Sequence, residues 1–235
     1  MAVLRLMTYN LRVAAPREKE PSWATRRDAV ASVIRFHNPD VVGVQEALLG
    51  MLADLNERLD AYEWLGTGRD AGEDEHCALF YHTDRLCPAR HDTFWLSETP
   101  DVPGSQSWGA SYPRIVTWME LPVSHSSLYI FNTHFDHDSA RARRESARLL
   151  RSQIDAIAGA APVALLGDLN TPPDTAPYRL LTRETDGAPL RDALHEAALP
   201  HHGPVATFNG FDTTVQPNER IDYIFVRGPL AVRRH

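Results

Sequence analysis

The run from Pro162 to Pro173, PVALLGDLNTPP, places the strongest constraint on how this chain can fold. Its first half, Val163 to Leu166, is continuously apolar and lacks the polar alternation of a strand that has one face in water. Such a run is typical of a strand buried on both faces, which requires a layer of structure on each side of its sheet. Gly167 then permits a tight turn or a close backbone approach.

Two polar residues follow this apolar run. In an extended segment the side chains of Asp168 and Asn170 lie on the same side, with Leu169 on the other. A carboxylate at the end of a buried strand costs free energy unless a partner compensates it. Carboxylates are ligands for Mg²⁺ or Mn²⁺, and an amide N–H can donate to a phosphoryl oxygen. The structural alternative is that Asp168 caps a turn and Asn170 forms an Asx-turn before the two prolines.

Composition narrows the class of protein. The chain has 235 residues, 43% of them hydrophobic, which suits one domain of ordinary to large size or two small ones. Its formal net charge is −7 and it has no lysine or arginine block, so high-affinity, non-specific binding to duplex nucleic acid is not favoured. Cys77 and Cys87 form neither a disulfide framework nor a CxxC pair.

The N-terminus, MAVLRLMTYN, does not have the pattern of a signal peptide. No segment approaches the roughly 18 consecutive apolar residues of a membrane span. We therefore expect a soluble, cytoplasmic protein without a membrane span, and we predict no protein partner.

The order of predicted elements changes along the chain. The first part alternates strand, helix, strand and helix, at residues 3–10, 23–37, 40–46 and 48–59. The next part predicts neighbouring hairpins of an antiparallel or mixed sheet, with strands at residues 63–67, 77–82, 85–96, 114–121 and 128–134. The last part predicts helices at residues 138–159, 177–181 and 190–198 and a final strand at residues 220–226. The loop from Ser97 to Pro113 is long, and long ordered loops often cover functional sites.

Polar side chains recur at the ends of these strands. Four strand ends carry them, at Asn10, Glu46, residues 132–136, and Asp168 with Asn170. Asp222 lies within the last strand, flanked by apolar residues on both sides. Turn chemistry does not account well for five such placements, because a buried carboxylate loses several kcal/mol unless it is paired or binds a metal.

Five motifs in this order resemble a known family. TYN, QE, NTHFDH, GDLN and RIDYIF are similar to motifs of the endonuclease/exonuclease/phosphatase superfamily of metal-dependent phosphohydrolases, and the resemblance runs from Met1 to Val226. TFWLSETPDVPGS, YPRIVTW and TFNGFD are similar to a bacterial subgroup of hydrolases within it. The resemblance implies an α/β (α+β) fold, a four-layer sandwich of two mixed sheets packed face to face with helices outside.

The resemblance also implies which residues bind the metal and perform the catalysis. Glu46 and Asn10 match the residues that hold the metal, Mg²⁺ or Mn²⁺, although either could instead serve only as a cap or turn residue. The implied catalytic residues are His134, Asp168, Asn170 and Asp222. Of these, Asp168 and Asn170 match the pair that orients the attacking water and binds the phosphoryl oxygen, and His134 matches a phosphate-contacting histidine. Asp222 matches the aspartate that orients a histidine near the C-terminus.

Three further residues are candidates for substrate binding. Arg114 can bind two phosphate oxygens at once, or form a structural ion pair. His137 is a candidate through the subgroup resemblance. Asn209 either faces the substrate or makes a turn beside Gly210. A zinc site made by His134 and His137 is disfavoured, since a strand-to-loop HxxH spacing points the rings apart.

The chain departs from the family at its end. The family closes with a Ser-Asp-His motif on a further strand, whereas this sequence ends PLAVRRH, and His235 is no convincing replacement. We therefore expect one domain over residues 1–235 that lacks its C-terminal strand and this motif. An exposed sheet edge and reduced catalysis would follow.

The sequence thus predicts a metal-dependent hydrolase of phosphate esters that uses in-line attack of a metal- and Asp168-oriented water. Its substrate would be either a nucleic acid or another phosphodiester, or a small phosphate ester. The alternative is a catalytically impaired module that binds phosphate and metal without turnover, which the missing terminal histidine would favour.

Overall fold

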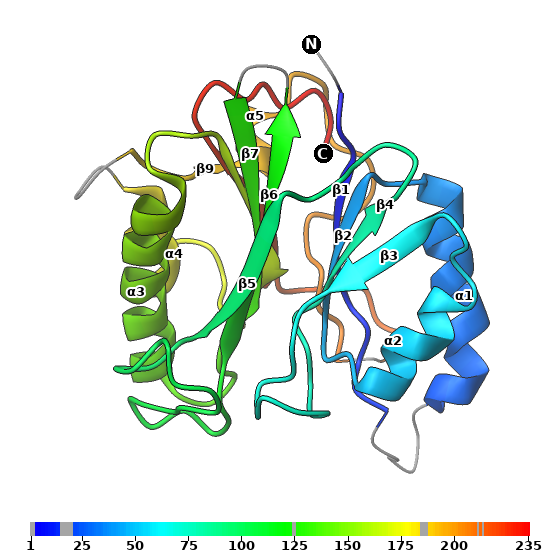
Figure 1. Ribbon diagram of the computed structural model, residues 1–235, viewed down its shortest axis with the longest axis horizontal. Coiled ribbons are helices and arrows are strands. Elements are labelled where there is room, and N and C mark those ends of the chain that lie inside the picture. Colours follow the sequence, from blue (N-terminus) through cyan, green and yellow to red (C-terminus); the bar gives the residue numbers. More distant parts are fainter. Residues whose placement is uncertain (1–2, 15–20, 124–125, 184–187, 211, 213) are drawn as a thin grey trace.

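The computed structural model describes residues 3–14, 21–123, 126–183, 188–210, 212 and 214–235. It has four layers, in which two β-sheets pack face to face and helices cover both outer faces (Figure 1). Each sheet contains parallel and antiparallel neighbours, so both are mixed. The four-layer α/β sandwich expected from the sequence is confirmed.

The first sheet has the strand order β1-β2-β4-β3. Its strands are β1 (Leu6–Asn10), β2 (Val41–Gln45), β3 (Tyr62–Leu65) and β4 (Leu79–His82). Helices α1 (Trp23–His37) and α2 (Leu49–Asn56) cover its outer face. Both helices contribute to one core with the strands, including the buried side chains of Ile34 and Leu52. Among the described residues β1 is an edge strand, since only β2 pairs with it.

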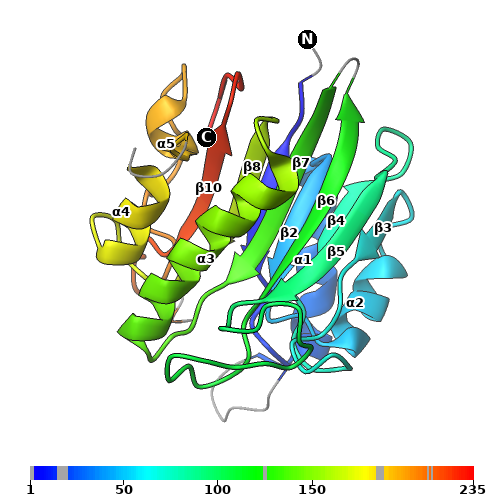
Figure 2. The ribbon, with the colours of Figure 1, turned by 60° about the vertical axis from the view of Figure 1, so that its left-hand side comes forward.

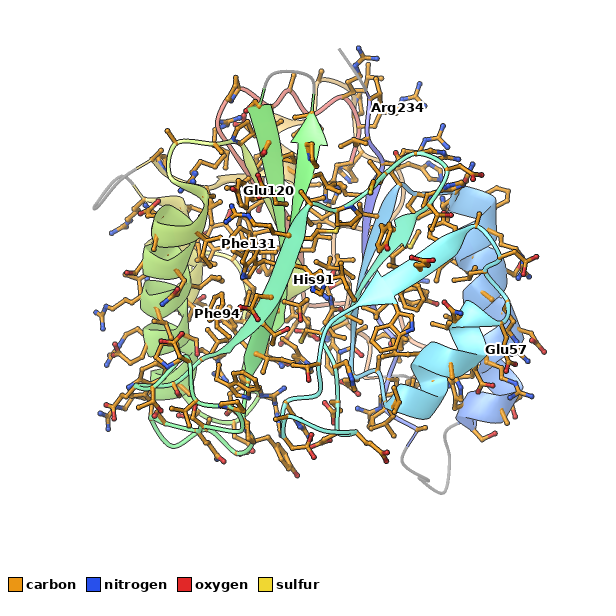
Figure 3. The ribbon with its side chains drawn as sticks, in the orientation of Figure 1. Glu57, His91, Phe94, Glu120, Phe131 and Arg234 are labelled. Atoms are coloured by element: carbon orange, nitrogen blue, oxygen red, sulfur yellow. The ribbon has the colours of Figure 1, made fainter. Side chains whose placement is uncertain are left out.

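The second sheet has the strand order β5-β6-β7-β8-β10-β9. Its strands are β5 (Arg90–Trp95), β6 (Ile115–Val123), β7 (Ser126–His134), β8 (Val163–Asp168), β9 (Arg191–Asp192) and β10 (Asp222–Arg227). Helix α3 (Ala140–Ala158) lies along its outer face together with α4 (Ala176–Thr182), as Figure 2 shows. Phe94 and Phe131 belong to the core on this helical side of the sheet (Figure 3).

The alternation of side chains along β8 explains why this strand organises the fold. Val163 and Leu165 pack into the core under α3, whereas Ala164 and Leu166 pack into the core between the two sheets. All six residues of the strand are buried. Side chains along a strand point alternately to its two faces, so Asp168, like Ala164 and Leu166, faces the space between the two sheets.

A polar contact joins the two sheets next to the functional end. The side chain of Asn132, fully buried on β7, donates through Nδ2 to the backbone oxygens of Val44 and Ala78 in the first sheet, both at 2.9 Å. Its Oδ1 accepts from Gln45 Nε2 at 2.7 Å. Gly43 makes room for this amide, since a Cβ there would lie 2.8 Å from Asn132 Cγ and Oδ1. These hydrogen bonds fix the position of β7 relative to β2 and to the residue just before β4.

Two predicted elements differ from the structure. The helix expected over residues 190–198 is only α5 (Ala193–Glu196), preceded by the short strand β9. Asp192 causes this break, because it caps α5 at Leu194 N and also accepts from Tyr178 and Arg220. The strand expected from residue 85 begins at Arg90, since Arg85 N and Leu86 N both bond to His82 O in a turn.

None of the helices in the described ranges is long and apolar enough to cross a membrane. The missing terminal strand and the single-domain boundary remain predictions.

The Gly43 contact yields a test of inter-sheet packing. Gly43→Ala should lower the free energy of unfolding by about 1–3 kcal/mol, because the new methyl group collides with Asn132 and lies 3.1 Å from Leu166 Cδ1. Gly50→Ala, in α2 with nothing within 4 Å of the new Cβ, is the matched control and should raise stability by about 0.5–1 kcal/mol. Urea unfolding of both variants measures the difference. Equal effects would contradict the packing constraint.

Candidate functional site

Polar side chains from both sheets meet at one end of the sandwich. They lie at or just beyond the carboxyl ends of β1, β2, β7 and β8 and at the start of β10, toward the lower end of Figure 1. The predicted residues that lie there are Asn10, Glu46, His134, Asp168, Asn170 and Asp222. The first sheet supplies the first two and the second sheet supplies the others, so the site is complete only when the sheets are packed together.

The Asn10 amide bridges two carboxylates across the sheets. Asn10 Nδ2 donates to Glu46 Oε1 at 2.9 Å and to Asp168 Oδ2 at 3.0 Å. Asn10 Oδ1 accepts from Arg12 N, and Glu46 Oε2 accepts from Val13 N at 2.7 Å. Glu46 therefore contacts the segment after β1 as well as the amide, and its position depends on both.

Glu46 and Asn170 have left-handed backbone conformations, with φ of 57° and 47°. A non-glycine residue in this region is uncommon, and for glutamate it costs free energy that the surrounding contacts must offset. For Asn170 those contacts include its own N–H, which donates to Asp168 Oδ1 at 2.8 Å. Asn170 Nδ2 also donates to Phe135 O at 2.9 Å. These bends direct both side chains into the space between the sheets.

Asp168 and Asp222 are opposite each other in the register of the antiparallel pair β8 and β10. Burial, followed by the negative charge of Asp222, raises the pKa of Asp168 to about 7, and Glu46 adds to this repulsion. Burial also raises the pKa of Asp222, against a hydrogen bond of 2.6 Å from Thr207 Oγ1 that favours its ionised form. The two aspartates and Glu46 thus form a cluster whose negative charges destabilise one another.

His134 and Asn170 form a second pair beside this cluster. Asn170 Nδ2 lies 2.8 Å from His134 Nε2, and Asp168 Oδ2 lies 3.8 Å from the same nitrogen. Burial, with the charges of Arg114 and Arg69, lowers the pKa of His134 well below its ordinary value. The imidazole is therefore neutral at pH 7, and it can donate a hydrogen bond without adding a charge.

Arg114 is buried immediately before β6 and supplies a cation. Its Nη2 lies 2.9 Å from His137 Nδ1, and its Nε lies 3.5 Å from Asp136 Oδ2. That Nε makes no hydrogen bond with any described residue. Asp136 also accepts from the backbone N–H groups of Ser111, Asp138 and Ser139, which divides its charge among several donors. Arg114 is therefore a buried cation with donor capacity to spare.

Arg114, His134 and Glu46 line one small cavity. The rest of its wall is formed by Arg69, Glu75, His76, Cys77, Pro113 and Ile115. Arg69 and Glu75, which lie in the loop between β3 and β4, were not predicted as site residues from the sequence. A signal was present, because β3 runs parallel to β2 and its carboxyl end therefore points to the same edge as Glu46.

The two remaining candidates have different surroundings. His137 lies beside the site, half exposed, with its ring stacked on Tyr112 at 6.2 Å between centroids. Asn209 Nδ2 donates to Asp212 O at 2.9 Å, which is the turn that the sequence offered as the alternative for this residue. His134 and His137 make side-chain contacts to different partners, Asn170 and Arg114.

The donor set at Glu46, Asn10 and Asp168 suits a hard divalent cation. A bound cation would relieve the mutual repulsion among the carboxylates of this site. A site made of oxygen ligands favours Mg²⁺ or Mn²⁺. Within the described residues, no three histidine, cysteine or acidic side chains converge closely enough to hold a metal by themselves. Such a site fits Mg²⁺, which uses one or two carboxylates and retains several water molecules.

The raised pKa of Asp168 predicts how the metal-free protein responds to pH. Between pH 4 and pH 7 the folded state keeps a proton on Asp168 that the unfolded state releases, so this residue's contribution to stability falls as pH rises through that window. Asp168→Asn removes the titration. In chelator, the stability of Asp168→Asn relative to wild type should therefore increase from pH 5 to pH 8, measured by urea unfolding. A difference that does not change with pH would contradict the assigned pKa.

Comparisons with known proteins agree with this geometry. A family model described as the endonuclease/exonuclease/phosphatase family matches residues 7–235. An uncharacterised protein of Acanthamoeba polyphaga mimivirus is 32% identical over 161 residues, which is 63% of this chain and 59% of the viral protein. The match thus spans about three fifths of that relative's length.

Solved structures provide the second comparison. A mannosyl-6-phosphatase of Bacteroides thetaiotaomicron superposes with a TM-score of 0.90 at 34% identity, covering 99% of this chain and 88% of that one. A family protein of Bacteroides vulgatus gives a TM-score of 0.90 at 33% identity, over 98% of this chain and 89% of its own. The human nocturnin catalytic domain shares only the fold, with a TM-score of 0.71 at 17% identity over 95% and 82% of the two chains. The chain belongs to the endonuclease/exonuclease/phosphatase family, whose members hydrolyse phosphate esters.

Proposed function

We propose that this protein is a metal-dependent hydrolase of phosphate esters and that its substrates are small phosphomonoesters. The observation that carries the proposal is the juxtaposition of an acidic cluster with buried phosphate-binding groups. Glu46, Asp168 and Asp222 form the acidic cluster, and Arg114 and His134 line a cavity together with Glu46. Acidic and phosphate-binding groups that adjoin at one edge suit a metal ion and a phosphate that bind next to each other.

Glu46 and Asn10 hold the Mg²⁺ or Mn²⁺ ion in this proposal. The bound ion supplies Lewis-acid stabilisation of the negative charge that develops on the phosphoryl oxygens. Asn10 has a second task, because its contacts with Glu46 and Asp168 fix the distance between the two carboxylates. Asp222 adds negative charge next to Asp168 and so raises its basicity.

The chain's own residues carry the remaining steps. Asp168 orients the attacking water and accepts its proton, since a carboxyl group of raised pKa is a better base near neutral pH. The neutral His134 ring donates a hydrogen bond to a phosphoryl oxygen, and Asn170 Nδ2, which contacts His134 Nε2 and Phe135 O, positions that ring. Arg114, which lines the same cavity, contributes positive charge to the binding of the phosphoryl group. The phosphoryl group is transferred in line to water, and the P–O bond to the leaving oxygen breaks on the opposite side, where that oxygen takes a proton from solvent and departs as the alcohol.

Two observations favour a small monoester over nucleic acid. The wall of the cavity beside Arg114 contains two acidic side chains, Glu46 and Glu75, which suit a short ester better than a polyanionic strand. The formal net charge of −7 opposes binding to an extended phosphate backbone. A mannosyl-6-phosphatase among the similar structures supports the same choice.

Removal of the carboxylate at Glu46 tests the metal-dependent reaction. Glu46→Gln should lower kcat/KM for p-nitrophenyl phosphate by about 10³-fold or more in Mg²⁺, because Lewis-acid stabilisation worth several kcal/mol is lost. Glu57→Gln makes the same change at an exposed residue after α2 (Figure 3) and should have no effect. Wild-type activity that persists in chelator, or full activity of Glu46→Gln, would reject the proposal. Metal binding without turnover of any ester would favour the binding module.

Substitution of Arg114 tests phosphate recognition separately. Arg114→Ala should lower kcat/KM by about 10²- to 10³-fold, since a preorganised donor to the transition state is removed. Arg114→Lys should fall between, because lysine keeps the charge and loses the second donor. Arg141→Ala, on the exposed face of α3, is the control. The same assay with bis-p-nitrophenyl phosphate and with plasmid DNA compares the ester classes, and faster hydrolysis of the diester would reject the monoester assignment.

A further inference from the structure

The loop of residues 66–78 forms one wall of the cavity and is held rigidly. Its backbone closes on itself, with Arg69 N donating to Glu75 O at 3.0 Å, and it docks beside Glu46 through His76 N and Ala47 O at 2.8 Å. Trp95 Nε1 donates to Arg69 O at 2.7 Å from the second sheet. The side chains of Arg69 and Glu75 are therefore presented to the cavity from a fixed backbone.

The two arginines of the cavity differ in how their charge is compensated. Arg69 makes two ion pairs, from Nε to Asp74 Oδ2 at 2.8 Å and from Nη1 to Glu75 Oε2 at 2.9 Å. Arg114 has one acidic partner, at 3.5 Å, and an unbonded Nε. A guanidinium already shared by two carboxylates attracts an anion weakly. Phosphate is thus expected at Arg114, and Arg69 with its partners suits an uncharged polar group.

Glu75 provides an acceptor to such a group. Its side chain is 17% exposed, and its only hydrogen bond with described residues engages Oε2, which leaves Oε1 for a donor in the cavity. Tyr112 supports this arrangement. Its ring lies under the Arg69 guanidinium at 4.4 Å and stacks on His137, and Ser111 next to it is bonded to Asp136 and Asp138. The cavity wall therefore has a charge-assisted acceptor fixed beside the phosphate groups.

We propose that Glu75, held by Arg69, binds hydroxyl groups of the leaving alcohol and so selects phosphomonoesters of sugars or other polyols. This inference rests on the proposed function, since it names the substrate class of the same site. A carboxylate oxygen that accepts from a substrate hydroxyl favours alcohols that carry one, because an alcohol without such a hydroxyl displaces water from that oxygen and does not replace the hydrogen bond. Arg69 is a positioning residue that holds Glu75 at the cavity through their ion pair. Burial raises the pKa of Glu75, and the positive charge of Arg69 opposes that shift.

The test compares a hydroxylated with a non-hydroxylated leaving group. We measure kcat/KM for mannose 6-phosphate and for phenyl phosphate with wild type, Glu75→Ala, Glu75→Gln and the control Glu73→Gln, an exposed glutamate of the same loop. Wild type should prefer the sugar phosphate. Glu75→Ala should reduce that preference at least about tenfold, mainly through KM, and Glu75→Gln, which keeps an acceptor oxygen, should reduce it less. Glu73→Gln should keep the wild-type preference.

Several outcomes would overturn the inference. The inference fails if wild type does not prefer mannose 6-phosphate over phenyl phosphate. It also fails if the Glu75 variants lose activity toward the two esters in equal proportion, because a purely structural role of Glu75 predicts that result. If wild type hydrolyses neither ester, the proposed function fails, and binding then decides the inference. Calorimetric titration with mannose 6-phosphate and with inorganic phosphate should show tighter binding of the sugar phosphate, and Glu75→Gln should diminish this difference. Equal affinities of wild type for the two ligands would reject the subsite.

Discussion

The Asn132 amide is buried where the two sheets meet, and the geometry of the site depends on it. Asn132 donates to two backbone oxygens of the first sheet and accepts from Gln45, so it sets how far β7 can slide against β2. Asn10 and Glu46 come from the first sheet, and Asp168 comes from the second. Hydrophobic packing alone tolerates small shifts, whereas hydrogen bonds to fixed backbone oxygens do so less readily. The contacts of Asn10 with both carboxylates require that precision.

Much of this arrangement could be predicted from the sequence, because it follows from local rules. An unbroken apolar run predicted a strand buried on both faces, and alternation predicted that Asp168 and Leu169 point to opposite sides. The ordered motifs then identified residues that the fold brings together, including His134 and Asn170. The four layers came from the family resemblance, since periodicity does not report how two sheets pack.

Other features depended on contacts between distant segments and were not predictable in this way. Asp192 interrupts a helical pattern because Tyr178 donates to one of its carboxylate oxygens and Arg220 to the other, and neither partner is near it in the sequence. Glu75 resembles any acid of a polar surface loop until that loop closes beside Glu46. The same holds for the pKa of Asp168, which burial and Asp222 determine together. These features depend on interactions between residues far apart in the sequence, which local sequence patterns do not report.

The left-handed backbone at Glu46 and Asn170 has a consequence for how this protein can evolve or be engineered. Glycine would adopt both conformations without strain, so a search for thermostability alone would tend to accept it there. Each such replacement would remove an oxygen-bearing side chain that converges on the centre of the site. Stability and activity are therefore in direct conflict at these two positions, and a thermostabilised variant should gain its stability elsewhere.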